Sequence, residues 1–137
     1  MSDRPDRAAT MHIGEVAERT GLSLRTLRHY DEIGLLEASG RTDGGFRLYT
    51  EDDLQRLMVI RRMKPLGYSL AETQEAMAII DAIADGESSP EASAGLTALL
   101  EQARERRRQL ERQVEMADDF IASLTAYARA SKARNRA

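Results

Sequence analysis

Arg25 and Arg28 are the residues of this sequence whose type and spacing most directly suggest a chemistry. They are three positions apart in a segment with helical periodicity, so their side chains lie on neighbouring turns of one helix face. A helix that enters the major groove of duplex DNA can present such arginines to guanine O6 and N7 or to phosphates. Tyr30 follows on the same helix, where its hydroxyl could hydrogen-bond a phosphate, although its ring is equally suited to the core.

Arg41 and Arg47 form a second candidate pair, on either side of the turn Asp43-Gly44-Gly45. Glycines in this position suit a tight β-hairpin, because they adopt positive φ at no steric cost. A hairpin tip flanked by arginines is suited to phosphate contacts at the edge of a groove. Each arginine taken alone is as often a solvated surface residue, so the prediction depends on the helix and the hairpin occurring together.

Charge and composition limit the functions that these residues can have. The net charge is -3, and residues 11–70 hold nine basic and nine acidic side chains, so DNA binding would depend on a few placed arginines. The chain has no cysteine, and its two histidines, His12 and His29, are far apart in sequence, so we predict no metal site and no redox centre. There is no phosphate-binding glycine loop and no nucleophile with a positioned base, so we expect neither an enzyme nor a cofactor.

No apolar run of this sequence approaches the roughly 20 residues that a membrane-spanning helix requires. No signal-peptide pattern opens the chain. We therefore expect a cytoplasmic protein with no membrane partner.

The arginines of the helix require a helix-turn-helix to position them. A helical pattern begins at Ile13 and stops at Gly21, which can supply the positive φ of a tight turn. Ser23 then stands at an N-cap position, and Leu27 and Tyr30 continue on a second helix. Two short helices around a glycine-containing turn are typical of a helix-turn-helix.

The arginines of the hairpin require a β-wing and a support behind it. The four residues that follow the glycine turn alternate as a short strand. Thr50 and Asp53 have the spacing of a capping box, which opens a helix predicted to end near Pro65. Ser69 and Glu72 form a second capping box and open another helix.

From Leu96 onward, apolar residues recur with the heptad spacing of a coiled coil. The predicted dimerisation residues are Leu96, Leu100, Ala103, Leu110, Val114, Ala117, Ile121 and Leu124. Such a helix spans roughly 50 Å, which is too long for a small domain to cover. We therefore expect the same helix of a second copy to cover the seam in a two-fold symmetric homodimer.

A basic run lies within this helix and consists of Arg104, Arg106, Arg107 and Arg108. Glutamates surround the run, which favours a charged coil exterior with intrahelical ion pairs over a second nucleic-acid site. Arg107 is also the one polar residue within the heptad pattern.

These elements predict a mainly α fold, with an N-terminal winged helix-turn-helix, a small β-wing and a long C-terminal dimerisation helix in an antiparallel coiled coil. The predicted organisation is a disordered arm at 1–10, the winged DNA-binding domain with its following helices at 11–83, a linker at 84–95, the coil at 96–128 and a disordered tail at 129–137.

Three segments resemble, in their order and spacing, the MerR family of transcription regulators (the mercury-resistance regulator type). They are IGEVAERTGLSLRTLRHYDEIGLL at 13–36, GGFRLYTEDDLQRL at 44–57 and LGYSLAE at 66–72. With the coil behind them, the resemblance covers nearly everything from residue 11 to about residue 128. The sequence departs from the family at His29, where Tyr or Phe is usual, and at Pro65, where the family's stretch is more often charged and helical.

The resemblance implies a homodimeric, sequence-specific regulator that reads double-stranded promoter DNA with its recognition helix and wing. The matching positions here are Arg25, Arg28, Tyr30, Arg41 and Arg47. The resemblance further implies binding between the −35 and −10 promoter elements, with bending and underwinding of a long spacer so that RNA polymerase engages both.

The effector of such a regulator is left open by the sequence. Many relatives sense through cysteines at the coil ends or through a large domain after the coil, and this sequence shows neither. We expect any effector to act through residues 66–128, for example in an apolar pocket between the 69–83 helix and the coil. A ligand-independent regulator, or one controlled by a protein partner, fits equally well.

Two other functions fit the same sequence. A repressor or architectural protein on this scaffold would bind DNA without activating transcription. A protein-interaction module would use its coil to bind a different protein, and its arginines would then be dispensable. The arginines present on both the helix and the wing count against the second of these functions.

Overall fold

Two short helices joined by a tight turn lie near the N-terminal end of the fold, in a computed structural model that describes residues 10–136. Helix α2 spans Ile13–Thr20 and helix α3 spans Leu24–Glu32. Gly21 between them has a φ of 76°, and its N–H donates to the carbonyl of Ala17, which ends α2. The predicted helix-turn-helix is therefore confirmed, with glycine at the position where a left-handed residue is needed.

A small antiparallel sheet packs beside these helices. Its strands are β1 (Met11–His12), β2 (Gly40–Arg41) and β3 (Arg47–Tyr49), in the spatial order β1-β3-β2. The hairpin of β2 and β3 is the predicted wing. Strand β1 was not predicted, because a two-residue strand has no periodicity and forms only by pairing Met11 with Tyr49, far along the chain.

Helices behind the wing complete the domain. They are α4 (Glu51–Met63), the short 3₁₀ helix η1 (Lys64–Leu66) and α5 (Leu70–Ala84). Both predicted capping boxes are present, at the start of α4 and at the start of α5. The chain ends α4 at the predicted place and then makes a 3₁₀ turn through Pro65, which the fixed φ of proline permits in a first helical turn.

The core of this winged domain is formed by apolar side chains from each of its larger elements. Fully buried examples are Val16, Leu27, Leu36, Tyr49 and Leu57. Leu27 is buried from α3, so the opposite face of α3 is left to solvent. Tyr49 packs into this core from β3.

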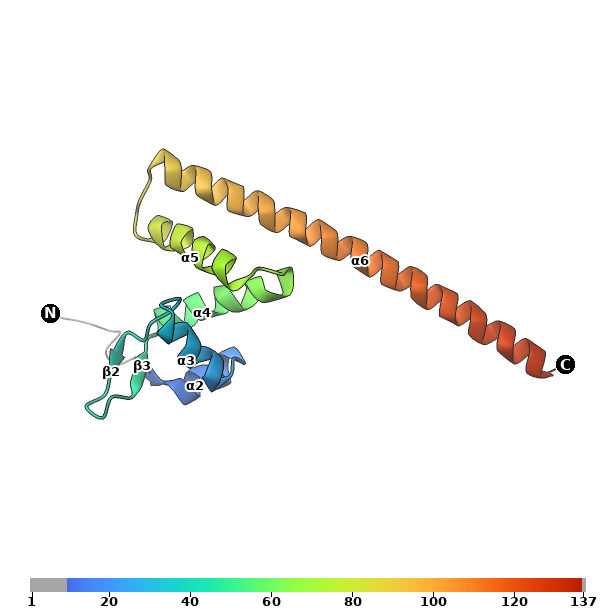
Figure 1. Cartoon of the computed structure of the whole chain (residues 1–137), viewed down its shortest axis with the longest axis horizontal. Coiled ribbons are helices and arrows are strands. Elements are labelled where there is room, and N and C mark those ends of the chain that lie inside the picture. The colour runs from blue at the N-terminus through green and yellow to red at the C-terminus, as the bar shows by residue number, and fades with distance from the viewer. Residues whose placement is uncertain (1–9, 137) are drawn as a thin grey trace.

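A single long helix, α6 (Pro90–Arg136), leaves the winged domain and runs far beyond it (Figure 1). It begins six residues before the predicted coil, because Ser89 accepts a hydrogen bond from the N–H of Ala92 and acts as a cap. It also continues through residues 129–136, where a disordered tail was expected. Both boundaries are corrections, and the alanine, lysine and arginine residues of 129–136 favour the added turns at the C-terminal end. The predicted N-terminal arm lies outside the described residues apart from Thr10.

Between residues 10 and 136, no helix is long and apolar enough to cross a membrane. In the same range, no group of His, Cys, Asp or Glu side chains has an arrangement that could hold a metal ion.

Candidate nucleic-acid interface

Helix α3 is held in place at its start by local hydrogen bonds. The hydroxyl of Ser23 accepts from the N–H of Thr26 at 3.0 Å, as an N-cap should. One turn earlier, the hydroxyl of Thr20 donates to the carbonyl of Val16 at 2.7 Å and accepts from the N–H of Leu22 at 3.2 Å. These bonds fix the angle between α2 and α3, and therefore the direction in which the exposed face of α3 points.

That exposed face carries the two arginines predicted to contact DNA. Arg25 and Arg28 line a shallow hollow together with His29 and Glu32. Among residues 10–136, neither arginine has a hydrogen bond or an ion pair, and both side chains are exposed. A pair of unpaired guanidinium groups on the open face of a capped helix is suited to bind guanine edges or phosphates.

The two wing arginines have a different environment. Arg47 Nε donates to Oδ2 of Asp31 at 2.6 Å, and Arg41 Nη2 donates to the same oxygen at 3.2 Å. Arg41 Nη1 also donates to the carbonyl of Gly45 at 3.0 Å. Arg41 is half exposed and Arg47 is mostly buried, so Arg41 is the better placed of the two to reach a phosphate.

Asp31, at the end of α3, is the residue that joins the wing to the recognition helix. Its other oxygen accepts from the backbone N–H of Ala38 at 3.2 Å. Burial raises the pKa of Asp31, but the hydrogen bonds from Arg47 and Ala38 and the charges of both wing arginines outweigh burial, so the pKa is lowered. The hydrogen bond to Asp31 in turn raises the pKa of Arg47. Asp31 was not among the predicted site residues, because its role arises only when the wing folds back onto α3.

Tyr30 lies on the inner side of α3 rather than with the arginines. Its side chain is partly buried and packs against the core, and burial raises the pKa of its hydroxyl. Its ring therefore has the core role that the sequence left as an alternative, and only its hydroxyl remains a candidate for a phosphate contact.

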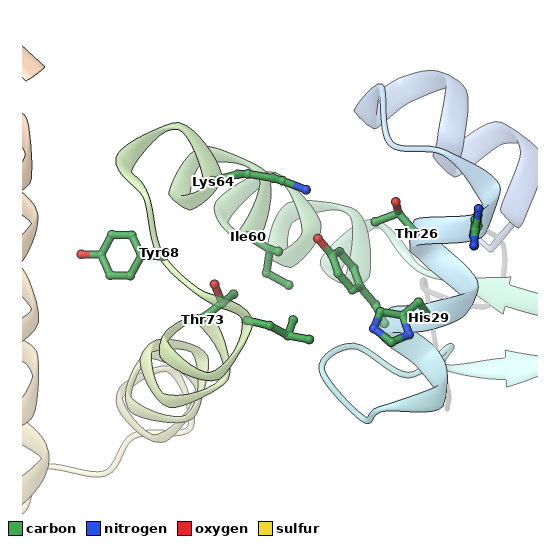
Figure 2. A pocket seen from close by; sticks show the side chains of 9 residues that line it. Thr26, His29, Ile60, Lys64, Tyr68 and Thr73 are labelled. Atoms are coloured by element: carbon green, nitrogen blue, oxygen red, sulfur yellow. The ribbon is translucent and has the colours of Figure 1, made fainter.

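A cavity of about 340 Å³ separates α3 from the helices behind it. Figure 2 shows its walls: Thr26 and His29 come from α3, Ile60 and Lys64 from the α4 side, and Tyr68 and Thr73 from the start of α5. Arg25 also lines this cavity, so Arg25 and Lys64 place positive charge on opposite walls.

Three cations near the end of α4 extend the basic surface beyond α3. Arg61 and Arg62 are exposed, and together with Lys64 they line a second hollow. The guanidinium of Arg61 lies beside Gly21, at the turn of the helix-turn-helix. These three residues were not among the predicted DNA-contact residues. The sequence did contain a signal for them, because three cations lie within positions 61–64 of a chain that has no net positive charge.

Helix α6 exposes most of its predicted dimerisation residues. Exposed fractions are 40% for Leu96, 48% for Leu100, 60% for Val114 and 59% for Ile121. Three large side chains outside the predicted heptad positions are exposed as well, namely Met116, Phe120 and Tyr127. A helix with this much exposed apolar surface requires a partner.

The predicted effector pocket between α5 and α6 has a structural counterpart. A groove of about 250 Å³ lies between these helices and is lined on its apolar side by Ala76, Ile79 and Leu99. Glu75 and Gln102 stand at its polar side. The groove has the position that was predicted for an effector pocket, and effector binding there stays a prediction.

Two family profiles match the chain. The first, described as MerR HTH family regulatory protein, matches residues 11–79, and the second, described as MerR, DNA binding, matches residues 54–126. Together they extend over the winged domain and most of α6.

Curated relatives resemble the N-terminal part of the chain. Nodulation protein NolA of Bradyrhizobium elkanii is 46% identical over 85 residues, which are 62% of this chain and 39% of NolA. The HTH-type transcriptional regulator YfmP of Bacillus subtilis is 54% identical over 68 residues, which are 49% of this chain and 49% of YfmP. The chain thus matches between two-fifths and half of the length of these relatives.

Solved structures resemble more of the chain. A MerR family regulator from Bacillus cereus is 34% identical, with a TM-score of 0.58 over 82% of this chain and 75% of the other. HiNmlR, a MerR family regulator lacking the sensor domain and solved bound to promoter DNA, is 29% identical, with a TM-score of 0.64 over 80% of this chain and 79% of HiNmlR. Both comparisons include the winged domain and a large part of α6.

Proposed function

The chain belongs to the MerR family of helix-turn-helix regulatory proteins, and from that membership we propose that it binds promoter DNA as a homodimer through α3 and the wing. The observation that carries the proposal is the exposed, unpaired state of Arg25 and Arg28 on a capped recognition helix. In this proposal α3 enters the major groove, and the two arginines contact base edges or phosphates there. The similarity to HiNmlR, which was solved on promoter DNA, supports the same reading.

The remaining basic residues would contact the DNA backbone on either side of α3. Arg41 lies on the wing, and Lys64 lies across the cavity from Arg25. Backbone contacts on both sides of a recognition helix fix its register on the duplex, whereas the base contacts select the sequence. Arg47 takes part indirectly, because it holds the wing against Asp31.

The homodimer is proposed from the apolar face of α6. Two copies packed antiparallel along the predicted heptad positions would cover side chains such as Leu110 and Val114. Two-fold symmetry would then present two α3 helices to a pseudo-palindromic operator, with half-sites about one helical turn of about 34 Å or a multiple apart.

We further propose that binding bends and underwinds a long spacer between the −35 and −10 elements, so that RNA polymerase can engage both. Bending a site of this size costs on the order of 1–6 kcal/mol, which additional backbone contacts can offset. A circularisation assay on the operator tests this step. DNA that closes at the same rate and with the same twist with and without bound protein would contradict distortion, and would favour a repressor that blocks the promoter.

The first experiment is chromatin occupancy of the tagged protein in its own host, compared with an Arg25→Ala/Arg28→Ala variant. We expect a few sharp peaks over promoters that disappear in the variant, because each bidentate base contact contributes about 1–3 kcal/mol of discrimination against the wrong base. The control is Arg104→Ala/Arg108→Ala, which removes the same charge from exposed positions of α6. Occupancy that is unaffected by the first variant would reject specific DNA recognition and favour a protein-interaction module built on the coil.

A further inference from the structure

Arg106 is the side chain of the α6 basic run that leaves its own helix and contacts the winged domain. Its Nη1 donates to the carbonyl of Leu66 at 3.2 Å, and its Nη2 donates to Oε2 of Glu72 at 3.0 Å. Its guanidinium also lies over the ring of Tyr68, 4.1 Å from the ring centroid. The side chain is only one-fifth exposed. Three different interactions of one planar cation therefore converge on a short stretch of chain.

The stretch that Arg106 contacts is the junction between η1 and α5. Glu72 is part of the capping box there: its Oε1 accepts from the N–H of Ser69 at 2.9 Å while its Oε2 accepts from Arg106. The hydrogen bond from Ser69 lowers the pKa of Glu72, desolvation opposes this, and Arg106 lowers the pKa further, so the pKa of Glu72 is lowered overall. Arg106 is thus built into the start of α5 and does not merely lie on its surface.

The same junction borders the cavity behind the recognition helix. Tyr68, on which Arg106 stacks, lines that cavity together with Lys64, Arg25 and His29. In Figure 2 the ring of Tyr68 lies on the side of the cavity away from His29, toward α6. Arg106 therefore stacks on a residue that forms the wall of this cavity on the side of α6.

Helix α6 packs along the winged domain from its start to Arg106. Gly95 and Leu99 line a groove with Ile79 of α5, and Arg106, about 16 Å beyond Gly95, makes the last of the contacts with the winged domain. Arg106 is therefore the point at which the helix leaves the domain, and its contacts there bear directly on the direction of the exposed arm.

Beyond Arg106 the helix extends without burial, because residues 107–136 are exposed. This arm is about 45 Å long, so a tilt of about 10° at its base would displace its end by about 8 Å. In a dimer joined along the arm, such a tilt changes the position of one recognition helix relative to the other.

We propose that Arg106 is a positioning residue that fixes the angle between the winged domain and α6, and so sets the half-site spacing at which the dimer binds DNA. The proposal rests on the proposed function, since it requires two recognition helices joined by α6. Arg106 itself does not contact DNA in this scheme. It acts through the η1–α5 junction and through the direction of the helix.

The first test measures affinity against half-site spacing. The probe is a duplex selected from a random library by the wild-type protein, remade with its half-sites one or two base pairs closer or further apart. Wild type should lose about tenfold or more in affinity per base pair, because recognition depends on the fixed separation of two helices. Arg106→Ala should weaken binding to the selected duplex and reduce the loss per base pair to below about threefold. Arg106→Lys should be intermediate, since it keeps the charge opposite Glu72 but loses the planar fork and the stacking.

Arg108→Ala is the matched control for this test. Arg108 is an exposed arginine on the same helix whose ion pair with Glu105 stays within α6, so its spacing profile should equal that of wild type. A uniform loss of affinity in Arg106→Ala at every spacing would show a merely stabilising role and overturn the proposal. A wild-type protein without spacing preference would overturn it as well.

The second test does not involve DNA and so separates this inference from the proposed function. The chain has no cysteine, so nitroxide labels can be placed at Glu18→Cys in α2 and Asp119→Cys in α6. With labelled protein diluted into excess unlabelled protein, pulsed electron spin resonance reports the distance within one protomer. We expect a narrow distribution in wild type and Arg108→Ala, and a broadened or shifted one in Arg106→Ala.

The two tests distinguish the possible failures. An unchanged distance distribution in Arg106→Ala would overturn the positioning role, whatever the protein binds. The proposed function would instead be rejected if the distribution changes but the protein selects no duplex, or if binding survives Arg25→Ala/Arg28→Ala. The role of Arg106 in half-site spacing would then be rejected with it.

Discussion

The Nε of Arg47 on the wing lies 2.6 Å from Oδ2 of Asp31 at the end of the recognition helix. Arg41 donates to the same oxygen, and the N–H of Ala38 donates to the other. One carboxylate therefore connects both wing strands and the loop before them to α3. In the proposed complex the position of the wing on DNA would depend on this carboxylate, although Asp31 itself has the wrong charge to contact DNA.

Replacing Asp31 with Asn should loosen the wing. The change removes a charged acceptor that is largely buried, and we expect it to lower the free energy of unfolding by about 1–3 kcal/mol. Operator affinity should fall as well, because a mobile wing must be ordered on binding. Thermal unfolding by circular dichroism and a fluorescence titration with operator DNA measure the two effects. Asp43→Asn, which changes an exposed acid at the wing tip, is the control and should alter stability little.

A double-mutant cycle separates the structural role of Arg47 from a direct contact with DNA. If Arg47 acts through Asp31, the effects of Arg47→Ala and Asp31→Asn on operator affinity should overlap, and the double variant should resemble either single one. Additive losses would contradict this and would identify Arg47 as a separate phosphate contact.

Acid should weaken the same connection. The pKa of Asp31 is lowered in the folded chain, so its ion pairs stabilise the fold above the ordinary aspartate pKa of about 4 and are lost as the pH falls through the lowered value. The difference in unfolding free energy between wild type and Asp31→Asn should therefore shrink as the pH is taken from 7 to below about 4. Urea titrations at several pH values measure it, and a difference that stays constant would show that the charge of Asp31 is not what holds the wing.

The parts of this fold that were predictable from sequence are those with local causes. The turn at Gly21 and the capping boxes that begin with Thr50 and Ser69 depend on residues within four positions of one another. The intrahelical ion pairs predicted for the basic run are also mostly present, since Arg104, Arg107 and Arg108 pair with glutamates of α6.

The parts that were not predictable depend on contacts between distant segments. Strand β1 exists only through its pairing with β3. The first turns of α6 looked like a linker because of their small residues; they are helical because Ser89 caps them and because Gly95 lies against Ile79 of α5. Asp31 and Arg106 looked like ordinary surface charges, since their partners are 16 and 34 positions away. Sequence therefore indicated the candidate DNA-contact residues more readily than the residues that hold them in position.

Tyr49→Phe should leave the fold intact or stabilise it. The hydroxyl of Tyr49 is buried and, among the described residues, has no hydrogen-bond partner, so the native chain carries the cost of an unsatisfied polar group. Removing it should raise the free energy of unfolding by up to about 1 kcal/mol. Thermal unfolding measures the change, with Tyr68→Phe as a control at a partly exposed tyrosine. A clear loss of stability would mean that the hydroxyl has a partner in solution.

Two glycines near the start of α6 should respond in opposite ways to alanine. A Cβ at Gly95 would meet the side chain of Ile79 at 3.5 Å, which is ordinary contact, so Gly95→Ala should stabilise the helix by about 0.5–1 kcal/mol. Gly86 has a φ of 91° and open space around it, so Gly86→Ala should destabilise through backbone strain alone. Chemical denaturation compares the pair. A loss of stability in Gly95→Ala would show that Ile79 has no freedom to accept the methyl group.

The dimer seam can be tested with one charge placed on or off the apolar face of α6. Val114 is 60% exposed in the single chain and occupies a heptad position, so Val114→Glu would bury two carboxylates against apolar partners in an antiparallel pair. We expect this variant to be monomeric by sedimentation equilibrium and to bind a half-site but not the full operator tightly, because the two recognition helices are no longer joined. Ala122→Glu adds the same charge at an exposed position that lies neither on the heptad seam nor on the face of Phe120 and Tyr127, and it should remain dimeric. A dimeric Val114→Glu would place the contact elsewhere on α6, where Met116, Phe120 and Tyr127 are the exposed apolar residues to substitute next.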